Sequence, residues 1–545
     1  MRIVIKNGTI VDGSGSPRFK ADLLIEDERI TKIGEDLKIE DAEIINAEDK
    51  IVSPGFIDIH NHSDLSIFQS LQNEPYILQG VTTIVVGMCG LGVYPSNKNV
   101  EKYYFNYLDK AFFSAGTMFE DVRSLWDDLK EKGGFSPNMA FFIPHGNVRA
   151  CVMGSKERKA NQEELEKMKK IIMEHMEAGT FGMSTGLVYP PGSVTSTEEL
   201  IELSKVIGEY DGIYDSHMRN EGAGVIDIGM NELIRIAREA NVRAHISHWS
   251  VISKYAYKMT PKVINHLKEA KKSGLELTAD VTVYDDGATS LSFILLSTWV
   301  FENFKENLNN KETRRKISTE IFEKLYSFFF ADAPFYLKLI PKFILKKLIF
   351  KGLAKGTTIL SVNHNREVEG MSVYKALTKL YPDKKLEESL LDFIRDEEGG
   401  ILIRIKHKDE EKSVIPIFKQ EFVCPSSDGF LEMEKNTHPR SYGAFARVLQ
   451  RWVREMNVVS LEEAIRKMTS LPASILKLNK RGLLKPGYKA DITIFNMEKI
   501  EEMGTIKDGK QHPLGIDYVI VNGAITARKG KHTGMRNGAI LKHQK

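Results

Sequence analysis

The two ends of the chain share a pattern of short strand-length apolar runs separated by tight turns. At the N-terminal end the turns include Asn7-Gly8 and Asp12-Gly13, both typical of hairpins. The apolar runs lie at residues 3–5, 9–11, 23–25 and 30–33, and similar runs return at 490–495 and 518–523. Since neither group is long enough to form a stable sheet alone, we expect the two to pair. The pattern predicts a small β-sandwich domain formed by residues 1–53 and 480–545.

Between the chain ends, apolar runs of strand length alternate with segments of helical periodicity. The expected strands are residues 55–59, 82–86, 139–143, 182–184, 212–215, 243–246, 276–282 and 421–424. The expected helices include residues 161–178, 197–209, 225–240, 261–273 and 442–454. Eight strands with helices between them indicate the α/β class and a (β/α)8 TIM-type barrel over residues 54–479.

The regular spacing fails once, between the seventh and eighth strands, where residues 286–420 form a long insertion. Its segment 338–355 holds six lysines and no acidic residue among apolar side chains. Contact of this segment, Lys338 to Lys355, with a membrane surface is one interpretation, but we favour a lid helix with solvated lysines. Long loops at the mouth of a barrel tend to be functional, so we expect a lid within the barrel domain.

Composition excludes several classes of protein. The 545 residues are 42% hydrophobic and 28% charged, which is ordinary for a folded globular protein. With 76 Lys+Arg against 74 Asp+Glu, the net charge of +2 gives no whole-protein reason to bind nucleic acid. The three cysteines (Cys89, Cys151 and Cys424) are odd in number and far apart, as expected of reduced thiols. Without a secretory signal or a long apolar run, we expect a cytoplasmic protein.

Candidate metal ligands recur where the predicted strands end. His60 and His62 lie two residues apart, so on a strand they point to the same face and can reach one metal ion. Cys89 shares a face with Thr83 and Val85 of the second strand. His248 shares a face with the apolar residues Ala244 and Ile246, while His245 is expected to face the helix layer.

Two more candidates follow the same rule. His217 stands where the fifth strand ends, and Asp428 follows the eighth. Strand ends converge at the carboxyl-terminal mouth of a barrel, where such enzymes place their sites. A single histidine at a strand end is more often structural. Five metal-type residues and a carboxylate together are difficult to explain by packing, and they favour a metal-dependent hydrolase.

These residues lie in motifs that resemble the N-acyl-D-amino-acid deacylase (D-aminoacylase) family of the amidohydrolase superfamily. The resemblance covers nearly the whole chain and is weakest across roughly 295–420. The matching stretches are residues 55–64 (GFIDIHNHSD), 80–90, 145–149, 184–192 (STGLVYPPG), 217–222 (HMRNEG), 246–248, 427–429, 438–443 (HPRSYG), 468–473, 515–523 and 532–536.

The resemblance implies a zinc-dependent hydrolysis of the amide bond of N-acyl amino acids, releasing a carboxylate and an amino acid. It implies one tightly held zinc ion on Cys89, His217 and His248, and a second, weaker site at His60 and His62. Asp428 matches the general base and acid. Residues 179–187 contain no lysine, whereas hydantoinases and dihydroorotases carry a metal-bridging carboxylated lysine there. This difference favours linear over cyclic amides.

The same resemblance places Tyr189, Tyr284, Ser290 and Arg440 in the substrate pocket. Arg440 is a natural bidentate partner for a substrate carboxylate, although a structural salt bridge is an equal alternative. Two departures from the family matter: Ser250 stands where a lysine is usual, and the turn after the seventh strand carries Asp285 and Asp286. Both changes are expected to make the site less positive.

Two other functions stay open at this point. One is an amidohydrolase that acts on a different amide, such as a cyclic amide, a dipeptide or an N-acyl amine. The other is a scaffold that keeps the barrel without catalysis, which the complete set of expected ligands disfavours. The implied partner is a small-molecule substrate. The sequence does not define the acyl group, the stereochemical preference or the oligomeric state.

Overall fold

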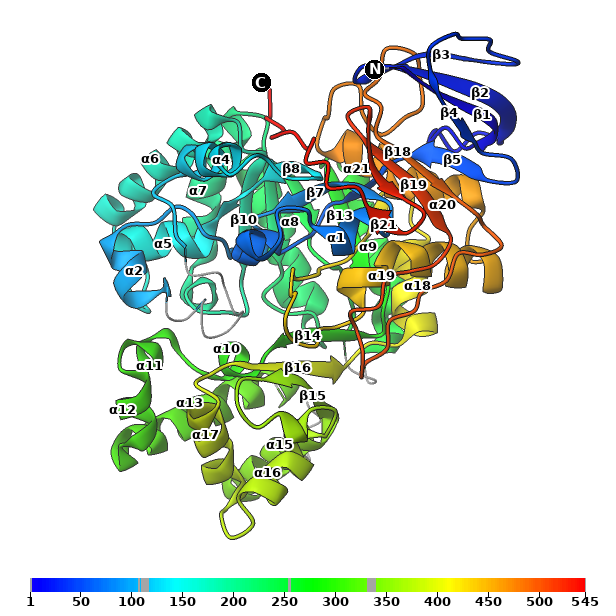
Figure 1. Cartoon of the computed structure of the whole chain (residues 1–545). Helices are drawn as coiled ribbons and strands as arrows, with labels where there is room; N and C mark the ends of the chain where they lie inside the picture. The colour runs from blue at the N-terminus through cyan, green and yellow to red at the C-terminus, as the bar shows by residue number, and fades with distance from the viewer. Residues whose placement is uncertain (1, 106–107, 109–116, 253–255, 331–339, 545) are drawn as a thin grey trace.

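The computed structural model describes residues 2–105, 108, 117–252, 256–330 and 340–544. One nine-stranded sheet joins the two chain ends (Figure 1), in the order β21-β20-β19-β18-β5-β1-β2-β3 with β4 beside β1. Its strands are β1 (Arg2–Ile10), β2 (Phe19–Glu26), β3 (Arg29–Gly34), β4 (Glu43–Asn46), β5 (Ile51–Pro54), β18 (Ile492–Phe495), β19 (Ile516–Val521), β20 (Ala524–Arg528) and β21 (Lys531–His532).

The antiparallel pair β5–β18 connects the two halves of this sheet, with Val52 opposite Ile494. Apolar side chains from both ends, including Ile5 and Ile492, form one buried cluster. The ends therefore pair as the pattern predicts. The hydrogen bonding places all nine strands in one sheet, however, and does not divide them between the two sheets of a sandwich.

The last residues leave this sheet and lie against the region of β8 (Asn138–Phe141). Gly538 donates its N–H to the carbonyl of Phe135 (2.8 Å), and Leu541 donates to that of Met139 (2.8 Å). The Leu541 side chain is 8% exposed and packs in a cluster with Ile475 and other apolar residues. This tail differs from the prediction that residues 480–545 all belong to the small β domain.

Eight parallel strands follow one another in the predicted order, with Phe142 interrupting the third. They are β6 (Phe56–Asp58), β7 (Val81–Val86), β8 (Asn138–Phe141) with β9 (Ile143–Pro144), β10 (Gly182–Gly186), β11 (Ile213–His217), β12 (Arg243–Ile246), β13 (Leu277–Thr282) and β17 (Val423–Ser426). The hydrogen bonding divides them into a sheet β6-β7-β8 and a sheet β9-β10-β11-β12-β13-β17. The α/β class of the prediction agrees with this arrangement.

Single contacts join the edges of these two sheets. At one edge, Phe142 donates its N–H to the carbonyl of Val86 (2.9 Å). At the other edge, the backbone N–H of Asp428 donates to the carbonyl of His60 (2.9 Å). The backbone N–H of His62 donates to the carbonyl of Gly429 (2.9 Å). The second set of contacts fixes the ends of the first and eighth strands beside each other, and both ends carry predicted site residues.

Amphipathic helices cover the strands. In α7 (Thr197–Glu209), Leu200, Leu203 and Ile207 recur at helical spacing and are buried. The other helices outside the insertion are α1 (Glu74–Ile77), α2 (Lys98–Tyr103), α4 (Val122–Glu131), α5 (His145–Met153), α6 (Gln162–Ala178), α8 (Asn231–Glu239), α9 (Thr260–Lys272), α19 (Arg440–Arg447), α20 (Leu461–Met468) and α21 (Ser470–Ile475).

Two predicted helices contain π-helical turns. The segment predicted as helix 225–240 begins with the π-helical residues Val225–Met230 before α8. The segment predicted as helix 442–454 begins at Arg440, and α19 continues into the π-helical residues Val448–Glu455. An apolar pattern of helical spacing does not distinguish these wider turns from an α-helix, so they could not be predicted.

The insertion is a small α/β unit on the side of the parallel strands away from the nine-stranded sheet (Figure 1). Its antiparallel sheet has the order β14-β16-β15. Its elements are β14 (Asp286–Ser290), α10 (Leu291–Leu295), α11 (Thr298–Glu302), α12 (Phe304–Asn309), α13 (Lys311–Phe330), α15 (Lys342–Gly356), β15 (Thr357–Val362), α16 (Val373–Leu380), α17 (Leu386–Asp396), β16 (Ile401–Lys406) and α18 (Ile415–Phe418).

Helix α15 contains most of the lysine-rich segment, whereas Lys338 lies outside the described residues. Leu345 and Ile349 are buried, but Phe343 is 70% exposed and Leu348 is 54% exposed. The expected apolar packing therefore holds for one face only. Among the helices that the structure describes, none is long and apolar enough to cross a membrane.

Because Leu541 is buried in an apolar cluster, we expect the tail to stabilise the folded protein. We expect Leu541→Ala to lower the free energy of unfolding by about 2 kcal/mol, because it removes buried apolar contacts with the cluster that includes Ile475. Chemical denaturation measures the change, with Gln544→Ala, at an exposed position of the same tail, as the control. Equal stability of the two variants would show that the tail does not stabilise the parallel strands.

Candidate metal centre

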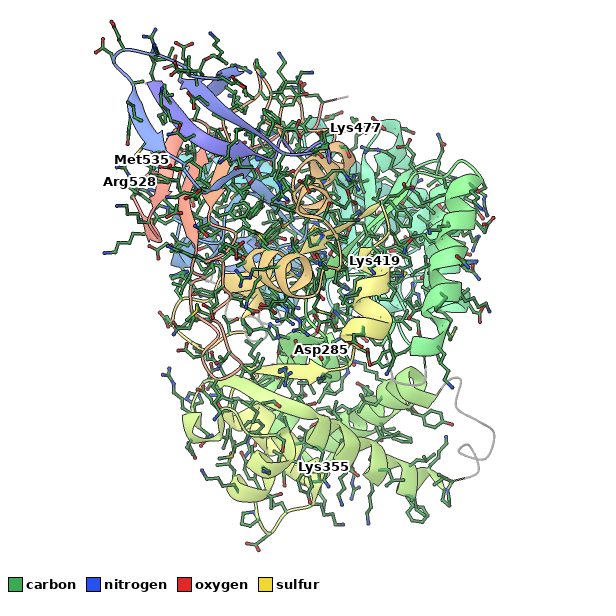
Figure 2. All side chains as sticks on the ribbon, turned by 90° about the vertical axis from the view of Figure 1, so that its right-hand side faces the viewer. Asp285, Lys355, Lys419, Lys477, Arg528 and Met535 are labelled. Carbon is green, nitrogen blue, oxygen red and sulfur yellow. The ribbon has the colours of Figure 1, made fainter. Side chains whose placement is uncertain are left out.

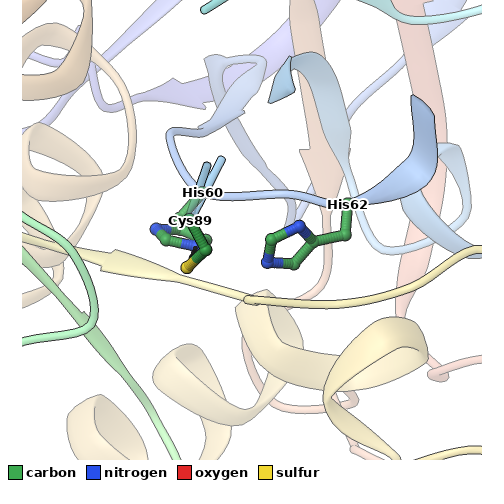
Figure 3. Close-up of side chains that lie close together, drawn as sticks. All are labelled: His60, His62 and Cys89. Atoms are coloured by element: carbon green, nitrogen blue, oxygen red, sulfur yellow. Dashed lines mark hydrogen bonds between the residues drawn. The ribbon is translucent and has the colours of Figure 1, made fainter. Parts of the chain in front are cut away.

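Three buried imidazoles meet at one sulfur atom. The Sγ atom of Cys89 lies 3.4 Å from His60 Nε2, 3.5 Å from His248 Nε2 and 3.8 Å from His217 Nδ1. Each of these residues stands at or just after the carboxyl end of a different parallel strand, as predicted. His62 completes the set, and Figure 3 shows its ring beside Cys89 and His60. The structure thus brings all five predicted metal ligands together.

These donors form two groups that share Cys89. One group is Cys89, His217 and His248, and the other is His60, His62 and Cys89; within each, the ligand atoms lie within 4.8 Å of one another. With Zn–S near 2.3 Å and Zn–N near 2.0–2.1 Å, a tetrahedral zinc site separates sulfur from nitrogen by about 3.6 Å. The separations of 3.5 and 3.8 Å to His248 and His217 agree with that value.

The protonation of the donors also suits a metal ion. Burial lowers the pKa of His217 to about 3 and that of His248 to about 4, so both imidazoles are neutral near pH 7. Burial raises the pKa of the Cys89 thiol to about 12. The thiolate therefore requires a cation beside it, and zinc supplies one, since metal binding deprotonates a cysteine ligand.

Three of the site residues have strained backbones. Cys89 (φ 53°), His248 (φ 34°) and Asp428 (φ 48°) all lie in the left-handed region, which residues with a side chain rarely adopt. Each comes two or three residues after its strand ends. The turn at each position aims the side chain at the site, and strain of this kind clusters at functional sites.

The prediction that His245 faces the helix layer is wrong. Ala244 and Ile246 belong to the large apolar cluster that includes the outer helices, so His245 points to the opposite, inner side. Its Nε2 lies 3.2 Å from Asp280 Oδ2, and its Nδ1 lies 2.7 Å from Thr278 Oγ1. Alternation along β12 does not extend to His248 because the backbone turns after Ile246.

Asp280 and Glu221 are buried carboxylates that the sequence interpretation did not single out. Asp280 Oδ2 lies 3.5 Å from His60 Nδ1, on the side of the ring away from Cys89. Glu221 Oε1 lies 3.3 Å from His248 Nδ1, and its Oε2 lies 4.0 Å from His217 Nε2. Carboxylates behind metal-binding imidazoles fix their orientation. The signals were an acid inside an apolar strand and an acid four residues after His217.

Asp428 lies between the histidines and Arg440. Its Oδ1 is 3.2 Å from His62 Nε2, and its Oδ2 accepts a hydrogen bond from Arg440 Nη1 (2.7 Å). Burial alone would raise the pKa of Asp428, but the Arg440 guanidinium and the neighbouring histidines hold it well below its ordinary value. The carboxylate is therefore ionised and able to accept a proton.

The four predicted substrate residues have different surroundings. The half-buried Tyr189 ring lies 4.9 Å from the His217 ring, and Arg440 is held by Asp428 and the carbonyl of Ala288. Tyr284 donates its hydroxyl to Glu502, and Ser290 Oγ accepts the N–H of Phe293 at the start of α10. Tyr189 and Arg440 thus border the metal residues, whereas the hydroxyls of Tyr284 and Ser290 already have partners.

Comparisons with known proteins agree with this geometry. The model of the amidohydrolase family matches residues 43–191 and 424–527. D-aminoacylase from Alcaligenes xylosoxydans xylosoxydans is 29% identical over 544 residues, which are 99% of this chain and 97% of the relative. A crystal structure of a D-aminoacylase superposes with a TM-score of 0.81 at 26% identity, covering 99% of both chains.

A second solved structure bears on the chemistry of its own site. N-acyl-D-glutamate deacylase from Bordetella bronchiseptica, complexed with zinc and a phosphonate that mimics the tetrahedral intermediate, has a TM-score of 0.80 at 26% identity and 99% coverage of both chains. Together these comparisons confirm the family resemblance that the motifs indicate.

Removing the shared sulfur tests the metal centre. We expect Cys89→Ala to lose most of the tightly bound zinc, because the variant removes the ligand common to both donor groups. Metal analysis after dialysis measures the loss. Cys151→Ala is the matched control, since Cys151 is also buried but lies on α5 outside either group. Unchanged zinc content in Cys89→Ala would contradict the assignment.

Proposed function

The chain belongs to the amidohydrolase superfamily, and from that membership we propose that it hydrolyses the amide bond of N-acyl-D-amino acids with bound zinc. The products are a carboxylate and an amino acid. The single observation that carries the proposal is the group Cys89, His217 and His248 beside the ionised Asp428, in a chain that matches D-aminoacylase over 99% of its length.

Cys89, His217 and His248 would hold the tight zinc ion, and His60 and His62 a second, weaker one. A bound zinc ion would lower the pKa of water and polarise the scissile carbonyl. Asp428 accepts the proton of the attacking water and returns it to the leaving nitrogen. Arg440 orients Asp428 through the 2.7 Å hydrogen bond to Oδ2, while Asp280 and Glu221 orient the imidazoles.

Tyr189, Tyr284, Ser290 and Arg440 are proposed to line the substrate pocket. Asp285 and Asp286, which suggested a less positive pocket, both have cationic partners. Asp285 pairs with Lys406 at 2.7 Å, and Asp286 pairs with Arg404 and with His438. These pairs weaken the case for a substrate without a carboxylate, since the two acids are already neutralised.

We also propose that the two parallel sheets act as one barrel spanning residues 54–479 and that the insertion, 286–420, is its lid. Support for the lid comes from Phe293 of α10, whose ring lies 4.6 Å from the Tyr189 ring, which in turn contacts His217. Such a lid excludes water and places apolar surface beside the acyl group. A cytoplasmic location stays a prediction.

Phe293 provides the test of the lid. We expect Phe293→Ala to lower kcat/KM about tenfold for long-chain acyl substrates and less for acetyl substrates, because lost apolar contact weakens binding of the longer chain. Phe343→Ala, at an exposed position of α15 in the same insertion, is the control. The same loss on both acyl lengths would leave the lid without a role in acyl selection.

The proposed function is tested by turnover and metal dependence together. We expect purified protein to hydrolyse N-acetyl-D-leucine, to lose activity on chelation and to recover it with zinc. Asp428→Asn should lower kcat about 1,000-fold, because it removes the general base.

Other outcomes separate the remaining functions. Full activity in protein without metal would refute the proposal. Hydrolysis restricted to cyclic amides, dipeptides or N-acyl amines would favour the alternative amidohydrolase. Stoichiometric zinc with no turnover of any amide would favour a binding scaffold.

A further inference from the structure

Lys408 is a buried cation that neither the metal centre nor the proposed mechanism uses. It follows β16, where the chain returns from the insertion to the barrel, and only 6% of it is exposed. Its backbone N–H donates to the carbonyl of Asp285 (3.0 Å), which ties the two strands of this connection together. Figure 2 shows Asp285 where the insertion meets the barrel.

The side chain of Lys408 turns towards the end of the seventh barrel strand. Its Nζ donates to Oγ1 of Thr282, the last residue of β13, at 2.5 Å. Thr282 pairs with Ser426 where β13 and β17 end, and Ser426 stands two residues before Asp428. Lys408 therefore lies at the carboxyl ends of these parallel strands, on the same side as Asp428.

No carboxylate forms an ion pair with this ammonium within the part of the chain that the structure describes, although Glu221 and Asp428 lie near enough to favour its charge. Its neighbour Lys406 pairs with Asp285 at 2.7 Å, but no carboxylate oxygen lies within 4.0 Å of Lys408 Nζ. A buried charge without a counter-ion is costly, so it is retained where a ligand supplies the opposite charge. The hydroxyl of Thr282 satisfies one N–H of the three and carries no charge.

Arg440, the other buried cation beside the site, is already neutralised. Its Nη1 binds Asp428 Oδ2, and its Nη2 binds the carbonyl of Ala288. A substrate anion at Arg440 would have to compete with the carboxylate that serves as the base. Of these two cations, Lys408 is the one that forms no ion pair among the described residues, so its charge is available to bind a substrate anion.

We propose that Lys408 binds the α-carboxylate of the substrate and so selects N-acyl amino acids over neutral amides. The inference rests on the proposed function and adds a specificity residue that the insertion, and not the barrel, supplies. The α-carboxylate fits better than a more distant side-chain carboxylate, because Lys408 lies near the residues around the scissile amide and the α-carbon adjoins that amide.

The experiment compares N-acetyl-D-leucine with N-acetyl-D-leucinamide, which lacks the carboxylate. For zinc-loaded Lys408→Met we expect kcat/KM to fall about 100-fold on the acid, mainly through KM, and less than threefold on the amide. Lys408→Arg, which keeps the charge, should retain most of the preference for the acid. Lys406→Met is the matched control, since Lys406 is the last residue of β16, two residues before Lys408, and is exposed and paired with Asp285; it should leave both rates unchanged.

Equal losses on the two substrates would overturn the proposal, because they would indicate a structural role. If the Met variant does not retain zinc, Lys408→Gln, which can still donate to Thr282, takes its place. Binding of N-acetyl-D-leucine and its amide to zinc-loaded Asp428→Asn protein, with and without Lys408→Met, needs no turnover. If the wild-type protein shows no deacylase activity but carboxylate binding still depends on Lys408, the proposed function is refuted and the Lys408 site is not. If carboxylate binding does not depend on Lys408, the site is refuted.

Discussion

Three buried imidazoles converge on the Cys89 sulfur, and the other parts of the site are arranged around this contact. The neutral imidazoles of His217 and His248 and the protonated Cys89 thiol gain little from one another in a dry interior, where they are removed from water. A cation with affinity for nitrogen and sulfur converts this arrangement from costly to favourable. The strand ends, the strained turns and the carboxylates behind the rings all serve to keep these donors at ligand distance.

Two layers of support hold the donors. The backbone accepts left-handed conformations at Cys89, His248 and Asp428, and single hydrogen bonds between the first and eighth strands keep His60 beside Asp428. Asp280 and Glu221 contact the far sides of the imidazole rings. On the open side, the insertion contributes Phe293 next to Tyr189 and Lys408 next to the end of β13. The parallel strands are proposed to supply the metal chemistry, and the insertion is proposed to supply recognition.

Sequence patterns located the proposed ligands better than they located their surroundings. His60, His62 and Cys89 could be found because metal-type residues at strand ends are uncommon by chance. The face of His245 was wrong because alternation holds only within a strand, and β12 stops at Ile246. Lys408 could not be found at all. It lies about 130 residues beyond the seventh strand, inside a lysine-rich insertion, and only tertiary structure distinguishes it from its exposed neighbour Lys406.

X-ray absorption at the zinc edge of the purified protein identifies the atoms bound to the metal and therefore tests whether Cys89 is a ligand. We expect one sulfur scatterer near 2.3 Å together with nitrogen scatterers near 2.0–2.1 Å. A spectrum with only nitrogen and oxygen around the zinc would contradict the claim that Cys89 is the centre of the site.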